Sequence, residues 1–76
     1  MKLSGKEFVV TGTLNAFSRE VAHERIKALG GTVKDNVTRK TAYLVVGAGP
    51  GANKVNRARE LGTPQITEEE FLALLA

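Results

Sequence analysis

The 76-residue sequence contains no cysteine and no tryptophan, and it has one histidine. The absence of cysteine excludes disulfide bonds, thiolate metal sites and cysteine nucleophiles. His23 alone does not make a metal site, and we expect it to be a surface residue rather than a catalytic base. No apolar run has membrane-spanning length, and the charged first residues do not fit a signal peptide. These absences favour a small soluble intracellular domain without a metal centre.

The charges of the two signs are distributed unevenly along the chain. All eleven lysine and arginine residues lie within residues 1–59, whereas residues 60–76 carry Glu60, Glu68, Glu69 and Glu70 and no basic residue. The formal net charge is only +3. This asymmetry is typical of a domain with one face suited to a polyanion, and a solvated surface of mixed charge is the alternative interpretation.

The hydrophobic pattern alternates between strand-like and helix-like segments. The expected strands are residues 7–12, 32–37, 42–47 and 65–66, and the expected helices are residues 19–29, 53–61 and 68–75. Ser18 and Thr67 are predicted N-caps, and Gly30 and Gly62 are predicted helix stops. The apolar residues of the last helix are expected to be buried, namely Phe71, Leu72, Leu74 and Leu75. Right-handed crossovers then predict an α/β fold with one four-stranded parallel sheet and helices on both faces.

Residues 47–52, Gly-Ala-Gly-Pro-Gly-Ala, match the glycine spacing of a dinucleotide-binding turn, and Glu68 follows at about the distance of a ribose-binding acid. Three features oppose that function. The motif lies in the second βα unit, and too little chain follows Leu61 for a second nucleotide-binding half. We also expect the helix to begin near Asn53, beyond the glycines, which leaves a pyrophosphate without a helix terminus. The sequence therefore predicts that this loop does not bind a dinucleotide.

Catalysis by the chain itself is not expected either. No serine or threonine is placed with a histidine and an acid in a nucleophilic relay, and the glutamates of the last helix are contiguous rather than paired across a cleft.

The end of the first strand and the start of the second helix carry residues that suit a phosphate. Both are expected at the same edge of a parallel sheet, where ligands of α/β proteins lie. Thr11 offers a hydroxyl, Gly12 an amide without a side chain, and Lys54 a positive charge near a helix start. The alternative is that Thr11 only closes the strand and Lys54 is solvated.

Several phrases of the sequence follow one another in a characteristic order. The first half, "GKEFVVTGTLNAFSREVAHERIKALGGTV", has a strand, Thr-Gly and a helix that ends at a glycine pair. The second half, "TRKTAYLVVG…NKVNRARELGTPQITEEEFLALL", has an apolar strand, Lys54 with Ala58 four positions on, and an acidic-then-apolar helix. The chain resembles a BRCT domain, with residues 1–76 as a single BRCT domain. It is most similar to the C-terminal BRCT module of bacterial NAD-dependent DNA ligases, whose "VVTGTL", "SRE", "ALGG" and "ITEEEFL" phrases are similar to these.

The resemblance implies a four-stranded parallel sheet in the order 2-1-3-4, flanked by three helices, two on one face and one on the other. Thr11, Gly12 and Lys54 match the positions that bind phosphate in members of the family. Arg19 matches an arginine with which the BRCT domain of a clamp loader binds recessed 5′-phosphates. Phe71 stands where many members carry tryptophan, a difference that concerns packing more than function.

The function implied by the resemblance is that of a non-catalytic module of a bacterial NAD-dependent DNA ligase, which contributes sequence-independent DNA binding in replication and repair. The expected phosphate-binding residues are Thr11, Gly12, Arg19 and Lys54, and the expected DNA-backbone contacts are Arg39, Lys40 and Arg57. The expected partners are nicked or 5′-phosphate-bearing DNA and other domains of the same ligase.

No cofactor is expected in this domain, because NAD and Mg²⁺ would be bound by other domains of a longer parent chain. The domain is expected to be monomeric, in the bacterial cytoplasm at the nucleoid. The alternative function is a protein–protein or phosphopeptide interaction module, although phosphopeptide readers of the family usually work as tandem pairs.

Overall fold

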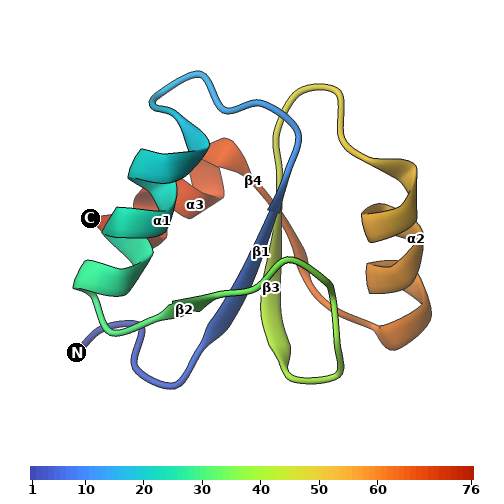
Figure 1. Cartoon of the computed structure of the whole chain (residues 1–76), viewed down its shortest axis with the longest axis horizontal. Helices are drawn as coiled ribbons and strands as arrows, with labels where there is room; N and C mark the ends of the chain where they lie inside the picture. Colours follow the sequence, from blue (N-terminus) through green and yellow to red (C-terminus); the bar gives the residue numbers. More distant parts are fainter.

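Seven regular elements follow one another in the order that the sequence predicts. The computed structural model describes residues 1–76, with β1 at Glu7–Thr11, α1 at Arg19–Ala28, β2 at Thr32–Val33, β3 at Thr41–Val46, α2 at Ala52–Leu61, β4 at Gln65–Thr67 and α3 at Glu68–Leu75. All strands pair in parallel in the order β2-β1-β3-β4. Helices α1 and α3 cover one face of the sheet and α2 covers the other (Figure 1). The predicted fold class and strand order are confirmed.

The helix ends lie at residues whose chemistry predicts them. The Ser18 hydroxyl accepts a hydrogen bond from the first turn of α1. Thr67 and Glu70 form a reciprocal capping box at the start of α3, with N···O distances of 2.9 and 3.1 Å. Gly30 and Gly62 follow α1 and α2 with φ of 88° and 70°, a left-handed conformation that favours glycine. The four predicted caps and stops are therefore confirmed.

Strand β2 is much shorter than the predicted strand over residues 32–37. It contains only Thr32 and Val33. Pairing with β1 ends at the hydrogen bond that Lys34 N donates to Phe8 O at 2.9 Å. The polar residues that follow turn the chain away from the sheet edge. Val37, which extends the apolar pattern in the sequence, is buried on the α2 face of the sheet. The prediction was wrong here because an apolar residue beyond a turn resembles the continuation of a strand.

The sheet separates two hydrophobic clusters of unequal size. The larger cluster lies against α1 and α3 and contains Leu3, Phe8, Val10, Leu14, Ala22, Ile26, Val45, Ile66 and Phe71. The smaller cluster lies against α2 and contains Val9, Val37, Leu44 and Ala58. Neighbouring residues of β1 and of β3 therefore point to opposite faces, as the two-residue period of a strand requires. The predicted arrangement, with helices on both faces of the sheet, is confirmed.

Helix α3 buries one aromatic side chain completely. Phe71 is 0% exposed, and its ring centroid lies 6.1 Å from that of Phe8 and 6.4 Å from that of Phe17. Leu72, which the sequence pattern places on the buried side, is instead 36% exposed. One residue along a helix turns the side chain by about 100°, and this turn directs Leu72 away from the sheet.

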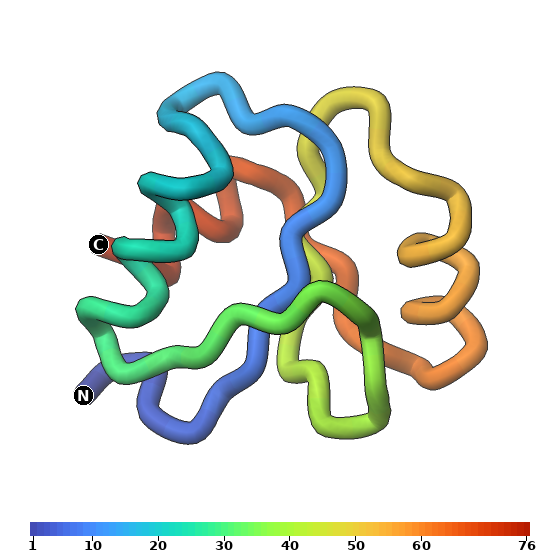
Figure 2. Tube along the Cα trace, viewed as in Figure 1, coloured from blue at the N-terminus to red at the C-terminus, as the bar shows by residue number.

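The two chain ends lie on the same side of the molecule, away from α2 (Figure 2). They are joined by a hydrogen bond in which the Lys2 ammonium group donates to the carbonyl oxygen of Ala76. No helix of the fold combines the length and apolar character that crossing a bilayer requires.

Candidate functional site

The loops that follow β1 and β3 are joined by backbone hydrogen bonds. Thr13 and Ala48 exchange a pair of these bonds at 2.8 and 2.9 Å, and Gly47 N donates to Thr11 O at 2.8 Å. The two backbones are so close that a Cβ atom on Gly47 would lie 2.5 Å from Thr13 O, and one on Gly12 would lie 2.7 Å from Ala48 O. Both positions therefore require glycine, and the two loops form one connected surface.

This pairing leaves few free hydrogen-bond donors in the glycine loop, residues 47–52. The N–H groups of Gly47 and Ala48 are used between the loops, and Gly51 N donates to the Thr11 hydroxyl at 2.9 Å. Pro50 has no N–H group. A dinucleotide turn instead directs its backbone N–H groups at the pyrophosphate. The residues present do not fit a pyrophosphate. No group of three or more His, Cys, Asp or Glu residues is placed to hold a metal ion.

Thr11 connects the end of β1 to the start of α2. Its side chain is on the α2 face of the sheet and only 4% exposed, and its hydroxyl oxygen accepts the hydrogen bond from Gly51, the N-cap residue of α2. A hydroxyl has one donor and two acceptor positions, so the O–H of Thr11 remains able to donate. Thr11 thus fixes the position of the helix that carries Lys54.

The edge of β1 is open beyond β2. The carbonyl group of Thr11 faces β3, where it accepts a hydrogen bond from the β3–α2 loop. The C=O and N–H groups of a trans peptide point in opposite directions, so the N–H of Gly12 faces the open edge. The N–H of Val10 faces the same edge, because the N–H groups of alternate residues share one side of a strand. Two backbone donors therefore lie beside each other where β2 has ended.

A hollow of about 270 Å³ opens at this edge, between α1 and α2. We call it the edge hollow, and it is lined by Val10, Arg19, His23, Lys34, Asp35 and Lys54. The structure thus brings together Arg19 and Lys54, which come from different halves of the chain and which the sequence predicts as phosphate ligands. Lys34 adds a third cation, and Asp35 is the only acid. His23, which we expect at the surface, is half-buried in the wall.

Lys34 was not among the predicted site residues. It lies immediately after β2, and its place in the hollow depends on how early that strand ends. The signal in the sequence is the polar run that begins at Lys34, which is typical of a strand end.

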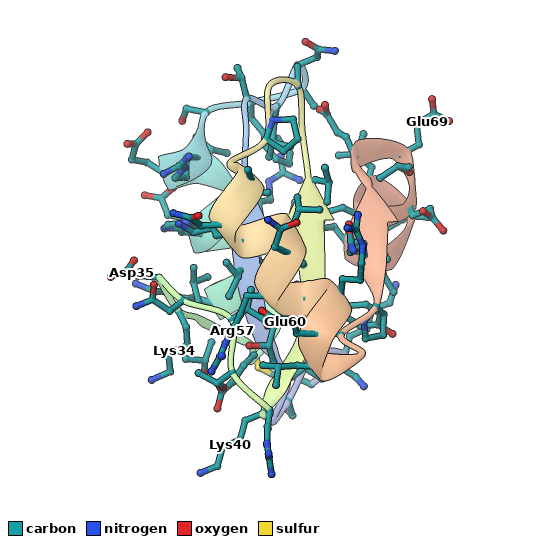
Figure 3. All side chains as sticks on the ribbon, turned by 90° about the vertical axis from the view of Figure 1, so that its right-hand side faces the viewer. Lys34, Asp35, Lys40, Arg57, Glu60 and Glu69 are labelled. Carbon is teal, nitrogen blue, oxygen red and sulfur yellow. The ribbon has the colours of Figure 1, made fainter.

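The other predicted residues do not line the edge hollow, and the buried Thr11 lines none of the hollows. Gly12 and Arg19 line a neighbouring hollow of about 220 Å³. Arg57 shares a hollow with Lys54, and Lys40 shares one with Lys34. Figure 3 looks onto α2 and shows Lys34, Lys40 and Arg57 in the same part of the view, together with Asp35 and Glu60, whereas Glu69 lies far from them. Arg39 is exposed and lines none of these hollows.

A contact that the sequence did not indicate holds the loop in front of Arg19. Asn15 N lies 2.9 Å from both carboxylate oxygens of Glu68, and Ala16 N donates to one of them at 2.7 Å. Glu68 is the first residue of α3. The Glu68 carboxylate therefore binds the β1–α1 loop. The only signal for this contact in the sequence is the presence of an acid in the first turn of a helix.

The family comparison agrees with the fold. The model of the BRCA1 C Terminus (BRCT) domain matches residues 1–75. The chain belongs to the BRCT family. This BRCT domain is similar to part of a DNA ligase from Dehalococcoides mccartyi (strain CBDB1), with 56% identity over 75 residues, which are 99% of this chain and 11% of that protein. It is also similar to part of a DNA ligase from Aquifex aeolicus, with 52% identity over 73 residues, 96% of this chain and 10% of that protein. The BRCT domain spans about a tenth of the length of these relatives.

Proposed function

We propose that this BRCT domain is a DNA-contacting module of a bacterial NAD-dependent DNA ligase and binds phosphate groups of nicked DNA without performing catalysis. The observation that carries the proposal is the edge hollow. Three cationic side chains, Arg19, Lys34 and Lys54, line a space of about 270 Å³ in which Asp35 is the only acid, and Gly12 lines the neighbouring hollow together with Arg19. Cations and N–H groups that converge on one space are the chemistry that recognises a phosphate.

Each residue has a defined role in this proposal. Arg19 donates two parallel N–H bonds to phosphate oxygens from the first position of α1. Lys54 supplies a mobile positive charge from the first turn of α2. The N–H of Gly12 faces the edge of β1 beyond β2, and the hydroxyl of Thr11, a residue only 4% exposed, keeps one donor position. Lys34 adds charge from the end of β2.

The contacts of the proposed site do not depend on base sequence. The edge hollow has one apolar lining residue, Val10, and offers no apolar recess for a base. Arg39, Lys40 and Arg57 are exposed cations that supply further contacts to the sugar-phosphate backbone. Binding is therefore governed by charge and falls as salt rises.

The chemistry of ligation belongs to other parts of the proposed parent chain. The glycine loop does not fit a pyrophosphate, so the proposal assigns NAD and Mg²⁺ to domains beyond this one. The matched ligases are about ten times as long as this domain, which leaves room for such domains. Because the proposed partner is nicked DNA, the proposed site of action is the bacterial cytoplasm.

The test is fluorescence anisotropy with duplex DNA that carries a single nick, with either a 5′-phosphate or a 5′-hydroxyl group at the nick. The affinity at low salt is expected to fall about tenfold in Lys54→Ala, which removes one charge-assisted phosphate contact. Duplexes of unrelated sequence should bind equally well.

Lys27→Ala is the matched control, because Lys27 is an exposed lysine in the last turn of α1 and lines none of the basic hollows. It removes the same charge and should change the affinity little. Absence of DNA binding at low salt, or equal affinities of wild type and Lys54→Ala, contradicts the proposal. Tight binding of a phosphoserine peptide in place of DNA favours an interaction module instead.

A further inference from the structure

A second hollow lies on the other side of Lys54. We call it the helix hollow; it has a volume of about 480 Å³ and is lined by Asn36, Val37, Thr38, Asn53, Lys54 and Arg57. Val37 is buried and is the only apolar residue of the lining. The lining contains no carboxylate, in contrast to the edge hollow with its Asp35. Every polar lining residue can donate a hydrogen bond through an amide, hydroxyl, ammonium or guanidinium group.

The polar walls of the helix hollow are held in place by the fold. The turn after Val37 is closed by hydrogen bonds from Thr38 N to Thr41 Oγ1 at 2.9 Å, from Thr41 N to Thr38 O at 3.1 Å and from Lys40 N to Thr38 Oγ1 at 3.2 Å. The Thr38 hydroxyl oxygen is therefore held in place as an acceptor, and its O–H remains free to donate.

The opposite wall belongs to α2. Lys54 and Arg57 are three residues apart on this helix, so they lie on the same face with Cβ atoms about 5–6 Å apart. Lys54 lines both hollows, whereas Arg19 lines only the edge hollow of the two and Arg57 only the helix hollow. Lys54 thus lies between two separate clusters of donors.

We propose that Lys54 bridges two adjacent phosphate subsites, and that the helix hollow binds the neighbouring phosphate of the same DNA strand. This inference rests on the proposed function and specifies its ligand as a chain of phosphates rather than one terminal phosphate. Asn36, Asn53, Thr38 and Arg57 are the donors of the second subsite.

The donor pattern favours nucleic acid over a singly phosphorylated peptide. A second donor cluster without an acid is redundant for one phosphate, whereas a DNA strand carries a charge at every nucleotide, about 3.4 Å apart along the helix axis. The helix hollow also lacks the apolar recess with which a peptide side chain is recognised, since Val37 forms only its buried base.

The experiment compares Arg57→Ala with Arg59→Ala, two variants of the same helix with the same change in net charge. Arg59 is exposed and lines none of the hollows. The affinity for nicked duplex DNA is measured by anisotropy over a series of salt concentrations. Arg57→Ala is expected to weaken binding about two- to fivefold at low salt, the effect of losing one exposed charge pair. It should also lower the slope of log K against log salt by about one, because one fewer phosphate is neutralised. Arg59→Ala should leave both quantities unchanged.

Inorganic phosphate, used as a competitor of DNA, separates the two subsites. Its inhibition constant should rise in Arg19→Ala and remain unchanged in Arg57→Ala, since a lone phosphate needs only the edge hollow. Replacing one phosphodiester next to the nick with an uncharged methylphosphonate should make wild type and Arg57→Ala bind equally well.

Two results overturn this inference and leave the proposed function intact. One is an equal salt slope for Arg57→Ala and Arg59→Ala while Lys54→Ala still weakens DNA binding. The other is an equal loss of phosphate inhibition in Arg19→Ala and Arg57→Ala, which indicates one subsite. Failure of the wild-type protein to bind DNA at low salt overturns both proposals. Circular dichroism of each variant checks that the fold is retained.

Discussion

The two faces of the sheet are stabilised by different means. The face covered by α1 and α3 holds nine buried hydrophobic residues, with Phe8 and Phe71 at its centre. The face covered by α2 holds four, and the only fully buried residue of α2 itself is Ala58. Buried apolar area contributes roughly 25 cal/mol per Å², so hydrophobic burial contributes more to stability on the face covered by α1 and α3 than on the face covered by α2.

Helix α2 is held in addition by close backbone contacts at its N-terminal side. Gly51 N bonds to the Thr11 hydroxyl, and the β3–α2 loop is joined to the β1–α1 loop through Thr13 and Ala48. The edge hollow therefore lies between a helix fixed by its core and a helix fixed by polar contacts and tight glycine packing. Substitutions on the two faces should accordingly have different consequences for stability and for DNA binding.

The largest loss of stability is expected on the larger face. Phe71→Ala removes a fully buried ring that contacts two other aromatic rings, and it should lower the free energy of unfolding by about 3–5 kcal/mol. Chemical denaturation monitored by circular dichroism measures this change. Leu72→Ala is the control on the same helix and should cost less than about 1 kcal/mol, because Leu72 is exposed. Similar losses in the two variants would contradict the assignment of Phe71 as the centre of this face.

A smaller loss is expected where the two loops touch. Gly47→Ala places a Cβ atom 2.5 Å from a backbone oxygen that cannot move freely, and it should lower the free energy of unfolding by about 1–3 kcal/mol. The same variant should weaken DNA binding, since it displaces the loop that leads to Lys54.

Gly51→Ala is the matched control for this prediction. Gly51 has φ of −70°, and its added Cβ atom would lie 3.4 Å from Thr11 Oγ1, an ordinary contact. Denaturation curves compare the free energies of unfolding of the two variants. A larger loss in Gly51→Ala than in Gly47→Ala would contradict the view that the close approach of the two loops requires glycine.

The smallest effect is expected at Thr11. Thr11→Val keeps the shape of the side chain but removes the acceptor of the Gly51 N–H, and it should cost about 1 kcal/mol. Hydrogen exchange of the Gly51 amide should become faster, as NMR can show residue by residue. Thr11→Ser retains the hydroxyl and should preserve the slow exchange. An unchanged exchange rate in Thr11→Val would mean that this bond does not hold the start of α2.

The sequence predicted most of the fold because the signals for it are local. Caps at Ser18 and Thr67, stops at Gly30 and Gly62, and a continuous apolar strand before Gly47 each lie within a few residues of the feature they determine. These signals determined the order of the elements, and the resemblance to the BRCT family supplied the strand order.

The parts that the sequence did not predict are contacts between distant residues. The bonds of Glu68 to the β1–α1 loop span 52 and 53 positions, and no local pattern pairs those segments. Lys34 lines the edge hollow because β2 ends at Val33. The apolar Val37 made the strand predicted from the sequence longer than the observed one. The approach of Thr11 to the start of α2 was predictable, because strand ends and helix starts of a parallel sheet meet at one edge. The position of Arg19 at the same site as Lys54 was implied only by the resemblance to the BRCT family.

The pairing of Thr13 with Ala48 also affects what binding costs in conformational entropy. The bonds between these residues join the segment that precedes Arg19 to the segment that precedes Lys54. The relative freedom of the two segments is thus already lost when the protein folds. In the proposed function, a phosphate in the edge hollow has only the ends of flexible side chains left to order, which keeps a larger share of the contact energy available as affinity.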